Sequence, residues 1–137
     1  MDTPDNFELV AGRGVYRPVG SVTLKETIDL VSAAIAYSRE QGIDNLMVNI
    51  TALTGFAPPS LAERYFLIEQ WAAVAGGKVR LAMVARAELI DPDKIGVLAA
   101  ANRGLVGNIF VTENEALNWL DNTYSQNVSP LEEKATG

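Results

Sequence analysis

The apolar residues of the chain follow two spacings, one typical of strands and one typical of helices. Short apolar runs predict five β-strands, at residues 7–11, 14–19, 46–50, 79–85 and 109–111. Longer stretches with an apolar residue every three or four positions predict four helices, at residues 24–41, 60–75, 92–103 and 113–120. A Gly-Arg-Gly turn should pair the first two strands antiparallel, whereas strands that alternate with helices pair in parallel through right-handed crossovers. We therefore expect a single α/β domain with a mixed, mostly parallel sheet and the order β-β-α-β-α-β-α-β-α.

The starts of the helices have local signals. Thr23, Ser60 and Thr112 each stand three residues before a glutamate, which is the pattern of a capping box. Asp91 followed by Pro92 predicts another start, with Asp91 as the N-cap and Pro92 at the first helical position. These signals support the number and the order of the predicted helices.

The ends of the chain lack the periodic pattern. Residues 1–6 are interpreted as a disordered lead, residues 7–120 as the α/β domain, and residues 121–137 as a mobile C-terminal tail. The first residues do not have the charged-then-apolar pattern of a signal peptide, and no window approaches the roughly 20 apolar residues that cross a bilayer. We therefore expect a cytoplasmic protein.

Composition excludes several kinds of chemistry. The 137 residues include no cysteine and no histidine, which excludes disulfides, thiolate catalysis, the Ser-His-Asp arrangement and most zinc sites. Seventeen acidic against eleven basic residues give a net charge of −6, which disfavours binding to nucleic acid. No nucleotide-binding motif is present, and the sequence predicts no cofactor and no metal site. An enzyme would depend on carboxylates or on a cofactor that no motif indicates.

Three stretches carry a resemblance to a known family: NLMVNITALTG at 45–55, KVRLAMVARAELIDPDKIGVLAAANRG at 78–104 and NIFVTENEALNWL at 108–120. Together with the order of the elements, they resemble the STAS domain superfamily, and within it the small bacterial SpoIIAA-like, or STAS/SEC14-like, proteins. The resemblance covers roughly residues 7–120. It implies an α/β fold and regulation through protein contact, because members of the family act as anti-sigma-factor antagonists.

The same resemblance draws attention to Ser60. Members of the family are phosphorylated on a serine at the start of the helix after the third strand, in a segment of the type Asp-Ser-Ser-Gly. The matching residues here are Ala57, Pro58, Pro59 and Ser60, so Ser60 stands where the family has glycine. Three interpretations remain open: an N-cap, which we favour, a candidate phosphorylation site at a helix N-terminus, and a nucleophile without a histidine base.

Helix 60–75 has a wide apolar surface. One stripe is predicted to face the core and consists of Leu61, Tyr65, Ile68, Ala72 and Ala75. A second stripe of Leu67, Trp71 and Val74 lies beside it, and Phe66 falls outside both. The second stripe packs on a neighbouring helix, forms a protein-contact surface, or covers an apolar groove for a lipid-like ligand.

Our leading hypothesis is a non-catalytic, STAS-like regulatory module that binds a protein partner and also pairs with itself as a homodimer. Its contact surface consists of helix 60–75 and the loop before it, at residues 51–59. The anchors in that surface are Phe56, Phe66, Leu67 and Trp71.

The alternative hypothesis is a carrier for a small apolar or anionic ligand. In parallel sheets, ligands bind at the carboxyl ends of the strands. Thr51, Thr54 and Arg86 follow predicted strands and are the candidate anion or ligand residues there. The nearby Asp91 and Asp93 are explained by the start of a helix, where the macrodipole favours carboxylates, so they do not predict a metal site.

Overall fold

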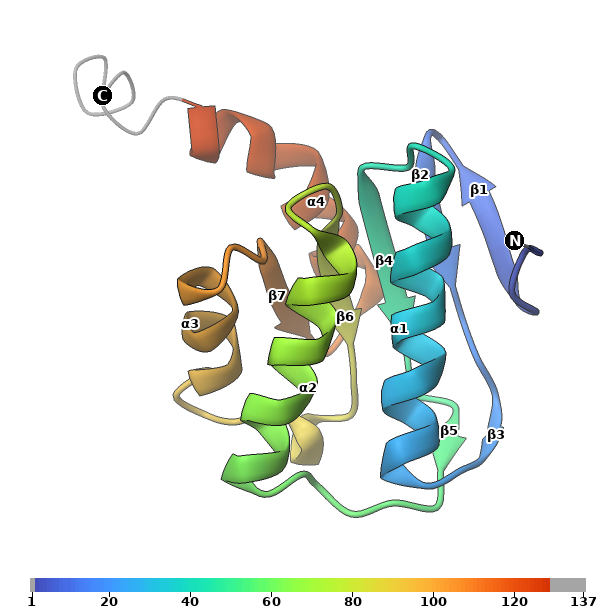
Figure 1. Ribbon diagram of the computed structural model, residues 1–137, viewed down its shortest axis with the longest axis vertical. Helices are drawn as coiled ribbons and strands as arrows, with labels where there is room; N and C mark the ends of the chain where they lie inside the picture. The colour runs from blue at the N-terminus through green and yellow to red at the C-terminus, as the bar shows by residue number, and fades with distance from the viewer. Residues whose placement is uncertain (1, 129–137) are drawn as a thin grey trace.

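The protein is described by a computed structural model that covers residues 2–128, with side chains for residues 2–122. The elements in chain order are β1 (Phe7–Val10), β2 (Arg13–Tyr16), β3 (Gly20–Ser21), α1 (Leu24–Glu40), β4 (Asn45–Asn49), β5 (Leu53–Thr54), α2 (Leu61–Ala75), β6 (Arg80–Val84), the 3₁₀ turn η1 (Ala87–Leu89), α3 (Ile95–Asn102), β7 (Gly107–Phe110) and α4 (Glu113–Val128). Each predicted strand and helix is present, so the predicted α/β class is confirmed (Figure 1).

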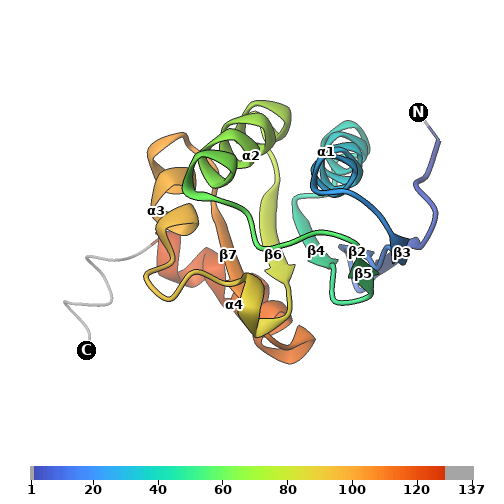
Figure 2. The same ribbon diagram turned by 90° about the horizontal axis from the view of Figure 1, so that it is seen from below.

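The main sheet has five strands in the order β1-β2-β4-β6-β7. Strand β1 pairs antiparallel with β2, and the other neighbours pair in parallel. The prediction of a mixed, mostly parallel sheet is therefore confirmed. Each parallel connection contains a helix, so the carboxyl ends of β4, β6 and β7 lie at one edge of the sheet, which Figure 2 views from below.

Helices cover both faces of the sheet. Helices α1, α2 and α3 lie on one face and α4 lies on the other (Figures 1 and 2). Each face has its own core, the larger of which includes Leu46, Val48 and Leu81 from the strands, packed against Val31 and Ile35 of α1. The smaller core joins Met47, Ala82 and Val84 to Ala116 and Leu120 of α4. Successive strand residues thus face opposite helical layers, as the strand period of two requires.

A second, two-stranded sheet was missed by the sequence analysis. Strands β3 and β5 pair in parallel, with Gly20 opposite Leu53 and Ser21 opposite Thr54. Each strand has only two residues, which is too short to leave an apolar pattern in the sequence. The small sheet fixes the path of the chain just before loop 51–59 reaches α2.

The predicted start of α3 and the predicted end of α4 are wrong. Helix α3 begins at Ile95 rather than Pro92, because Asp91 to Lys94 form a turn in which the amide of Lys94 donates to the carbonyl of Asp91 over 3.0 Å. Helix α4 continues to Val128, well past the predicted end at Leu120. The rest of the predicted tail, residues 129–137, lies outside the described residues.

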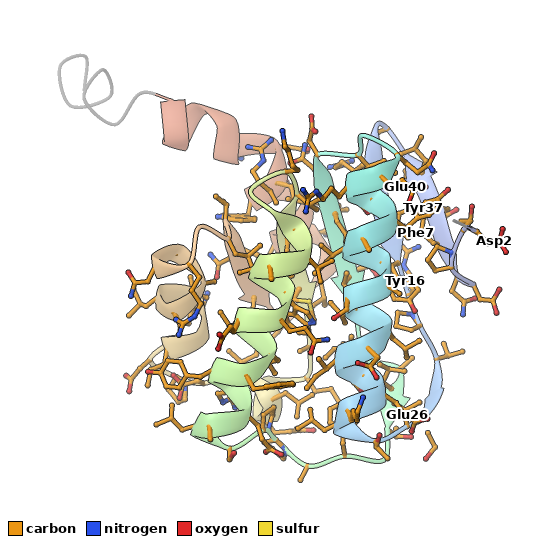
Figure 3. The ribbon with its side chains drawn as sticks, viewed as in Figure 1. Asp2, Phe7, Tyr16, Glu26, Tyr37 and Glu40 are labelled. Atoms are coloured by element: carbon orange, nitrogen blue, oxygen red, sulfur yellow. The ribbon has the colours of Figure 1, made fainter. Side chains whose placement is uncertain are left out.

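Part of the N-terminal segment, which the sequence analysis interprets as a disordered lead, contacts the domain. The hydroxyl oxygens of Thr3 and Tyr37 lie 2.8 Å apart, and the amide of Arg17 donates to the carbonyl of Asn6 over 3.1 Å. Beside these contacts, the ring of Phe7 lies edge-on to that of Tyr37, with centroids 5.0 Å apart (Figure 3). This packing ties β1, at the edge of the sheet, to α1.

Candidate functional site

An apolar cavity of about 120 Å³ lies between α2, α3 and the face of the sheet. Its walls come from α1, α2, α3, β6, β7 and the loops beside them, and the apolar members include Ile28, Phe56, Leu67, Trp71, Leu89 and Val97. An engineered cavity of about 150 Å³ with similar apolar walls holds benzene. The present cavity is somewhat smaller, which sets the size of the apolar group that it accommodates at no more than about six carbon atoms.

Small residues of α3 help to leave this space open. Gly96 lines the cavity, and a Cβ atom built there would have only Cδ1 of Ile68 nearby, at 3.9 Å. Ala100, one turn further along α3, also lines the cavity. Larger side chains at these positions would fill the space.

Loop 51–59 contributes to the wall through Phe56 and Pro59. The small β3–β5 sheet fixes the start of this loop, and Gly55 follows it with a φ of 100°. A side chain at Gly55 would meet the carbonyl oxygen of Val22 at 2.6 Å, so only glycine permits this close approach. The loop is thereby directed under α2, which brings Phe56 to the cavity.

Three of the four predicted contact anchors point inward. Trp71 is only 6% exposed, and its indole Nε1 donates to the carbonyl of Ile28 on α1 over 3.2 Å. Leu67 and Phe56 are half-buried and line the cavity. Of the three interpretations of the second apolar stripe, packing on a neighbouring helix is the one that describes Trp71, so its side chain is not exposed as a contact anchor.

The outer face of α2 also differs from the predicted pattern. Leu61 and Tyr65 were assigned to the core stripe, but their side chains are 54% and 40% exposed. Phe66, the fourth predicted anchor, is 59% exposed. The helix therefore exposes three large apolar side chains in its first two turns while burying Ile68 and Trp71.

Ser60 is the N-cap of α2. Its hydroxyl accepts from the amide of Glu63 over 3.2 Å, and the Glu63 carboxylate accepts from the amide of Ser60 over 2.8 Å. This reciprocal pair is the predicted capping box, which is confirmed. Phosphorylation of the exposed Ser60 stays a prediction, and Arg64, one turn further along α2, donates to the carbonyl of Leu89.

The charged part of the cavity wall consists of Arg64, Asp91 and Lys94. The Arg64 guanidinium donates to the carbonyl of Leu89 over 3.3 Å. The Lys94 ammonium donates to the side-chain oxygen of Asn108 over 2.9 Å and lies 5.2 Å from the centroid of the Phe110 ring. Asp91 accepts from the amide of Ile95 over 3.0 Å, so its carboxylate is engaged at the start of α3.

Sequence analysis missed Lys94. Its backbone is left-handed, with φ 51° and ψ 43°, a conformation that residues other than glycine, asparagine and aspartate adopt infrequently. The sequence predicts that α3 starts at Pro92, which would put Lys94 inside the helix. The sequence pattern therefore gives no indication that the Lys94 side chain lies at the cavity.

The three predicted ligand residues at the rim lie outside the cavity wall. Thr51 donates through its amide and its hydroxyl to the side-chain oxygen of Asn49, over 2.9 and 2.7 Å. Thr54 belongs to β5, where the amide of Val22 donates to its carbonyl. The Arg86 guanidinium faces Glu88, with Nε and Oε1 3.5 Å apart. The cavity wall instead includes Phe56, which was predicted as a contact anchor, and Asp91, which was predicted as a helix cap.

On the opposite face of the sheet, a polar network at the start of α4 was also missed. Glu113 accepts from Arg17 through both carboxylate oxygens, over 2.8 and 2.9 Å, and from Asn49 over 2.7 Å. The hydrogen bonds from Arg17 chiefly, with those from Asn49, lower the pKa of Glu113 to about 2 against the opposing effect of burial. The same carboxylate raises the pKa of Arg17. These hydrogen bonds join the chain after β2, the end of β4 and the start of α4.

Within residues 2–128, no group of three acidic side chains has the arrangement of a metal site, and no helix is both long and apolar enough to cross a bilayer. No protein-family model matches the chain, and no curated protein matches it significantly in sequence. The fold thus stands as an α/β domain with a mixed five-stranded sheet.

Proposed function

We propose that the protein binds a small, largely apolar molecule in the cavity beneath α2. The observation that carries this proposal is the cavity itself, whose wall is apolar apart from the few polar groups named above. The inward positions of Phe56, Leu67 and Trp71 support it further, because these side chains form the wall instead of a surface for a protein partner. Burial of an apolar ligand there is favoured by about 25 cal/mol per Å² of apolar area removed from water.

The role we propose is carriage or sensing of the ligand, without catalysis. The chain has no histidine or cysteine. The Asp91 carboxylate in the wall accepts from the amide of Ile95, and the Lys94 ammonium donates to the side-chain oxygen of Asn108, so both groups are engaged in structural hydrogen bonds. A location in the cytoplasm, as expected from the sequence, is part of this proposal.

The experiment is a titration of the protein with toluene, followed through the methyl resonances of Leu67, Leu89 and Val97. Binding in the cavity should shift these resonances in a saturable way. In Gly96→Leu, the added side chain starts inside the cavity and should weaken binding at least about tenfold, with Gly96→Ala between this variant and the wild type.

Ala101→Leu is the matched control, because it adds the same kind of side chain to the exposed face of the same helix. It should bind toluene as the wild type does. Circular dichroism establishes that each variant is folded. Absence of saturable shifts in the wild type, or equal affinity in the wild type and Gly96→Leu, would overturn the proposal.

A second candidate function is self-association through the outer face of α2. Leu61, Tyr65 and Phe66 are exposed there, and the STAS resemblance, which we propose reflects membership of that superfamily, favours protein contact near this helix. Sedimentation of the wild type should then show a dimer, and Phe66→Asp should raise the dissociation constant of that dimer at least about tenfold. Leu9→Asp, at an exposed apolar position on β1, is the control. A wild type that is monomeric at all concentrations would refute this candidate.

A further inference from the structure

We propose that the ligand of the cavity is a small carboxylate, with its apolar body beneath α2 and its negative charge held by Arg64 and Lys94. This inference rests on the proposed function and specifies its substrate class. It follows from the charges in the wall, the partners that those charges have, and the size of the space.

The first observation is that both cations lack a carboxylate partner within the described part of the chain. Arg64 bonds to a backbone carbonyl, and Lys94 bonds to an amide oxygen. Arg13 and Arg17 pair with Asp121 and Glu113, whereas Arg39 and Arg103 also bond to backbone carbonyls. Arg64 and Lys94 differ from these cations because they line the cavity. The two cations in the cavity wall are held by neutral acceptors and keep their positive charge uncompensated.

The second observation is that both cations retain unused donors. A guanidinium has five N–H groups and an ammonium has three, and each side chain donates once in the hydrogen bonds above. These existing bonds hold each side chain in place without satisfying it. A carboxylate, which accepts through two oxygens, complements such donors.

The third observation concerns the single acidic group in the wall. Asp91 opposes an anion, but its carboxylate already accepts from the amide of Ile95. Two positive charges and one negative charge leave the wall with a net positive charge. An uncharged ligand would gain nothing from that charge, and a cationic one would be repelled by it.

The volume sets the size of the apolar body. About 120 Å³ accommodates a group close to a benzene ring, which is smaller than a long acyl chain. Benzoate is therefore a suitable probe, and benzamide is its neutral analogue of nearly the same shape. Comparison of the two in the wild type isolates the contribution of charge without any substitution.

Titrations of benzoate and benzamide at pH 7, read from the same methyl resonances, test the inference. The wild type should bind benzoate about tenfold more tightly than benzamide, because hydrogen bonds to charged groups are stronger than neutral ones. Lys94→Met and Arg64→Met should each weaken benzoate several-fold and leave benzamide unchanged. Lys78→Met, at an exposed lysine after α2, removes the same charge outside the cavity and should change neither.

The possible results distinguish failure of the carboxylate inference from failure of the proposed apolar binding site. If both probes bind with equal affinity in a saturable way, and Gly96→Leu abolishes both, the carboxylate inference is overturned and the apolar cavity stands. If neither probe nor toluene binds, both proposals fail. If benzoate is preferred but Lys78→Met removes the preference as fully as Lys94→Met, binding follows net charge, and the assignment of the two cations is overturned.

Discussion

The network around Glu113 allows a quantitative prediction. Glu113 ties the start of α4 to Arg17 after β2 and to Asn49 at the end of β4 through three hydrogen bonds. Glu113→Gln keeps the size of the side chain but removes the charge and replaces one accepting oxygen with an N–H donor that faces other donors. The free energy of unfolding at pH 7 should therefore fall.

The magnitude follows from the lowered pKa. The difference between the ordinary value of 4.5 and the value of about 2 in the folded protein corresponds to at most about 3.4 kcal/mol, at about 1.4 kcal/mol per pH unit. Since the side chains of Glu113 and Arg17 are 29% and 46% exposed, solvent screens the interaction. We expect Glu113→Gln to lower the free energy of unfolding by about 1–2 kcal/mol at pH 7.

The dependence on pH has a definite sign. A carboxylate whose pKa is lowered by folding stabilises the protein above the pKa of the unfolded chain, near 4.5. That stabilisation is lost as the pH falls from about 4.5 to about 2. Urea unfolding from pH 7 to pH 2.5 should show the wild type and Glu113→Gln converging in this window, as Glu113 of the wild type becomes protonated.

Glu69→Gln is the control for the change in net charge. Glu69 is an exposed carboxylate on α2 that makes no hydrogen bond or ion pair with the side chains described in residues 2–122. Its substitution should change the free energy of unfolding by less than about 0.5 kcal/mol at every pH. A difference between the wild type and Glu113→Gln that is below about 0.3 kcal/mol at pH 7, or that stays constant down to pH 2.5, would refute the reasoning.

Two further substitutions test the surroundings of the cavity. Trp71→Phe removes the hydrogen bond to the carbonyl of Ile28 and part of a buried ring, so it should lower the free energy of unfolding by about 1–3 kcal/mol in urea titrations while leaving sedimentation unchanged; a change in association without loss of stability would contradict its buried role. Ser60→Ala removes the cap of α2 and should cost about 1 kcal/mol, whereas Ser60→Asp, which can still accept from the Glu63 amide, should cost less; equal losses in the two variants would contradict the capping role.

The fold was predictable because strand and helix periods differ and because the capping patterns at Thr23 and Ser60 mark helix starts that the structure retains. The start of α3 was not, because Asp91 and Pro92 give a strong local signal for a start that the following turn displaces by three residues. Asp91 nevertheless bonds to the first helical amide, at Ile95, so the signal identified the capping group and misplaced the helix. A local pattern reports which groups can cap, whereas the turn geometry decides where the helix begins.

The candidate site was harder to predict than the fold, because its parts belong to separate segments. The sequence indicated that α2 has more apolar surface than one core stripe needs, and it offered three explanations for the excess. The structure divides that surface: Trp71 packs on α1, Leu67 lines the cavity, and Phe66 remains exposed. The periodicity within α2 does not distinguish a side chain that packs on α1 from one that lines the cavity or one that stays exposed, because each outcome depends on the neighbouring element.

What lies opposite α2 also explains why the cavity exists. Helix α3 places Gly96 and Ala100 in the cavity wall, so the apolar side of α2 faces small residues there, whereas the ring of Trp71, on α2 itself, packs against α1. Close packing normally removes such a space, since an unfilled cavity costs about 20 cal/mol per Å² of its surface. Cavity-filling residues at Gly96 should therefore raise stability if they fit, and the same substitutions should abolish binding. With glycine at position 96, the protein lacks the stability that a larger side chain there would supply. Such a loss of stability is expected at a binding site and is not expected in a core selected for stability alone.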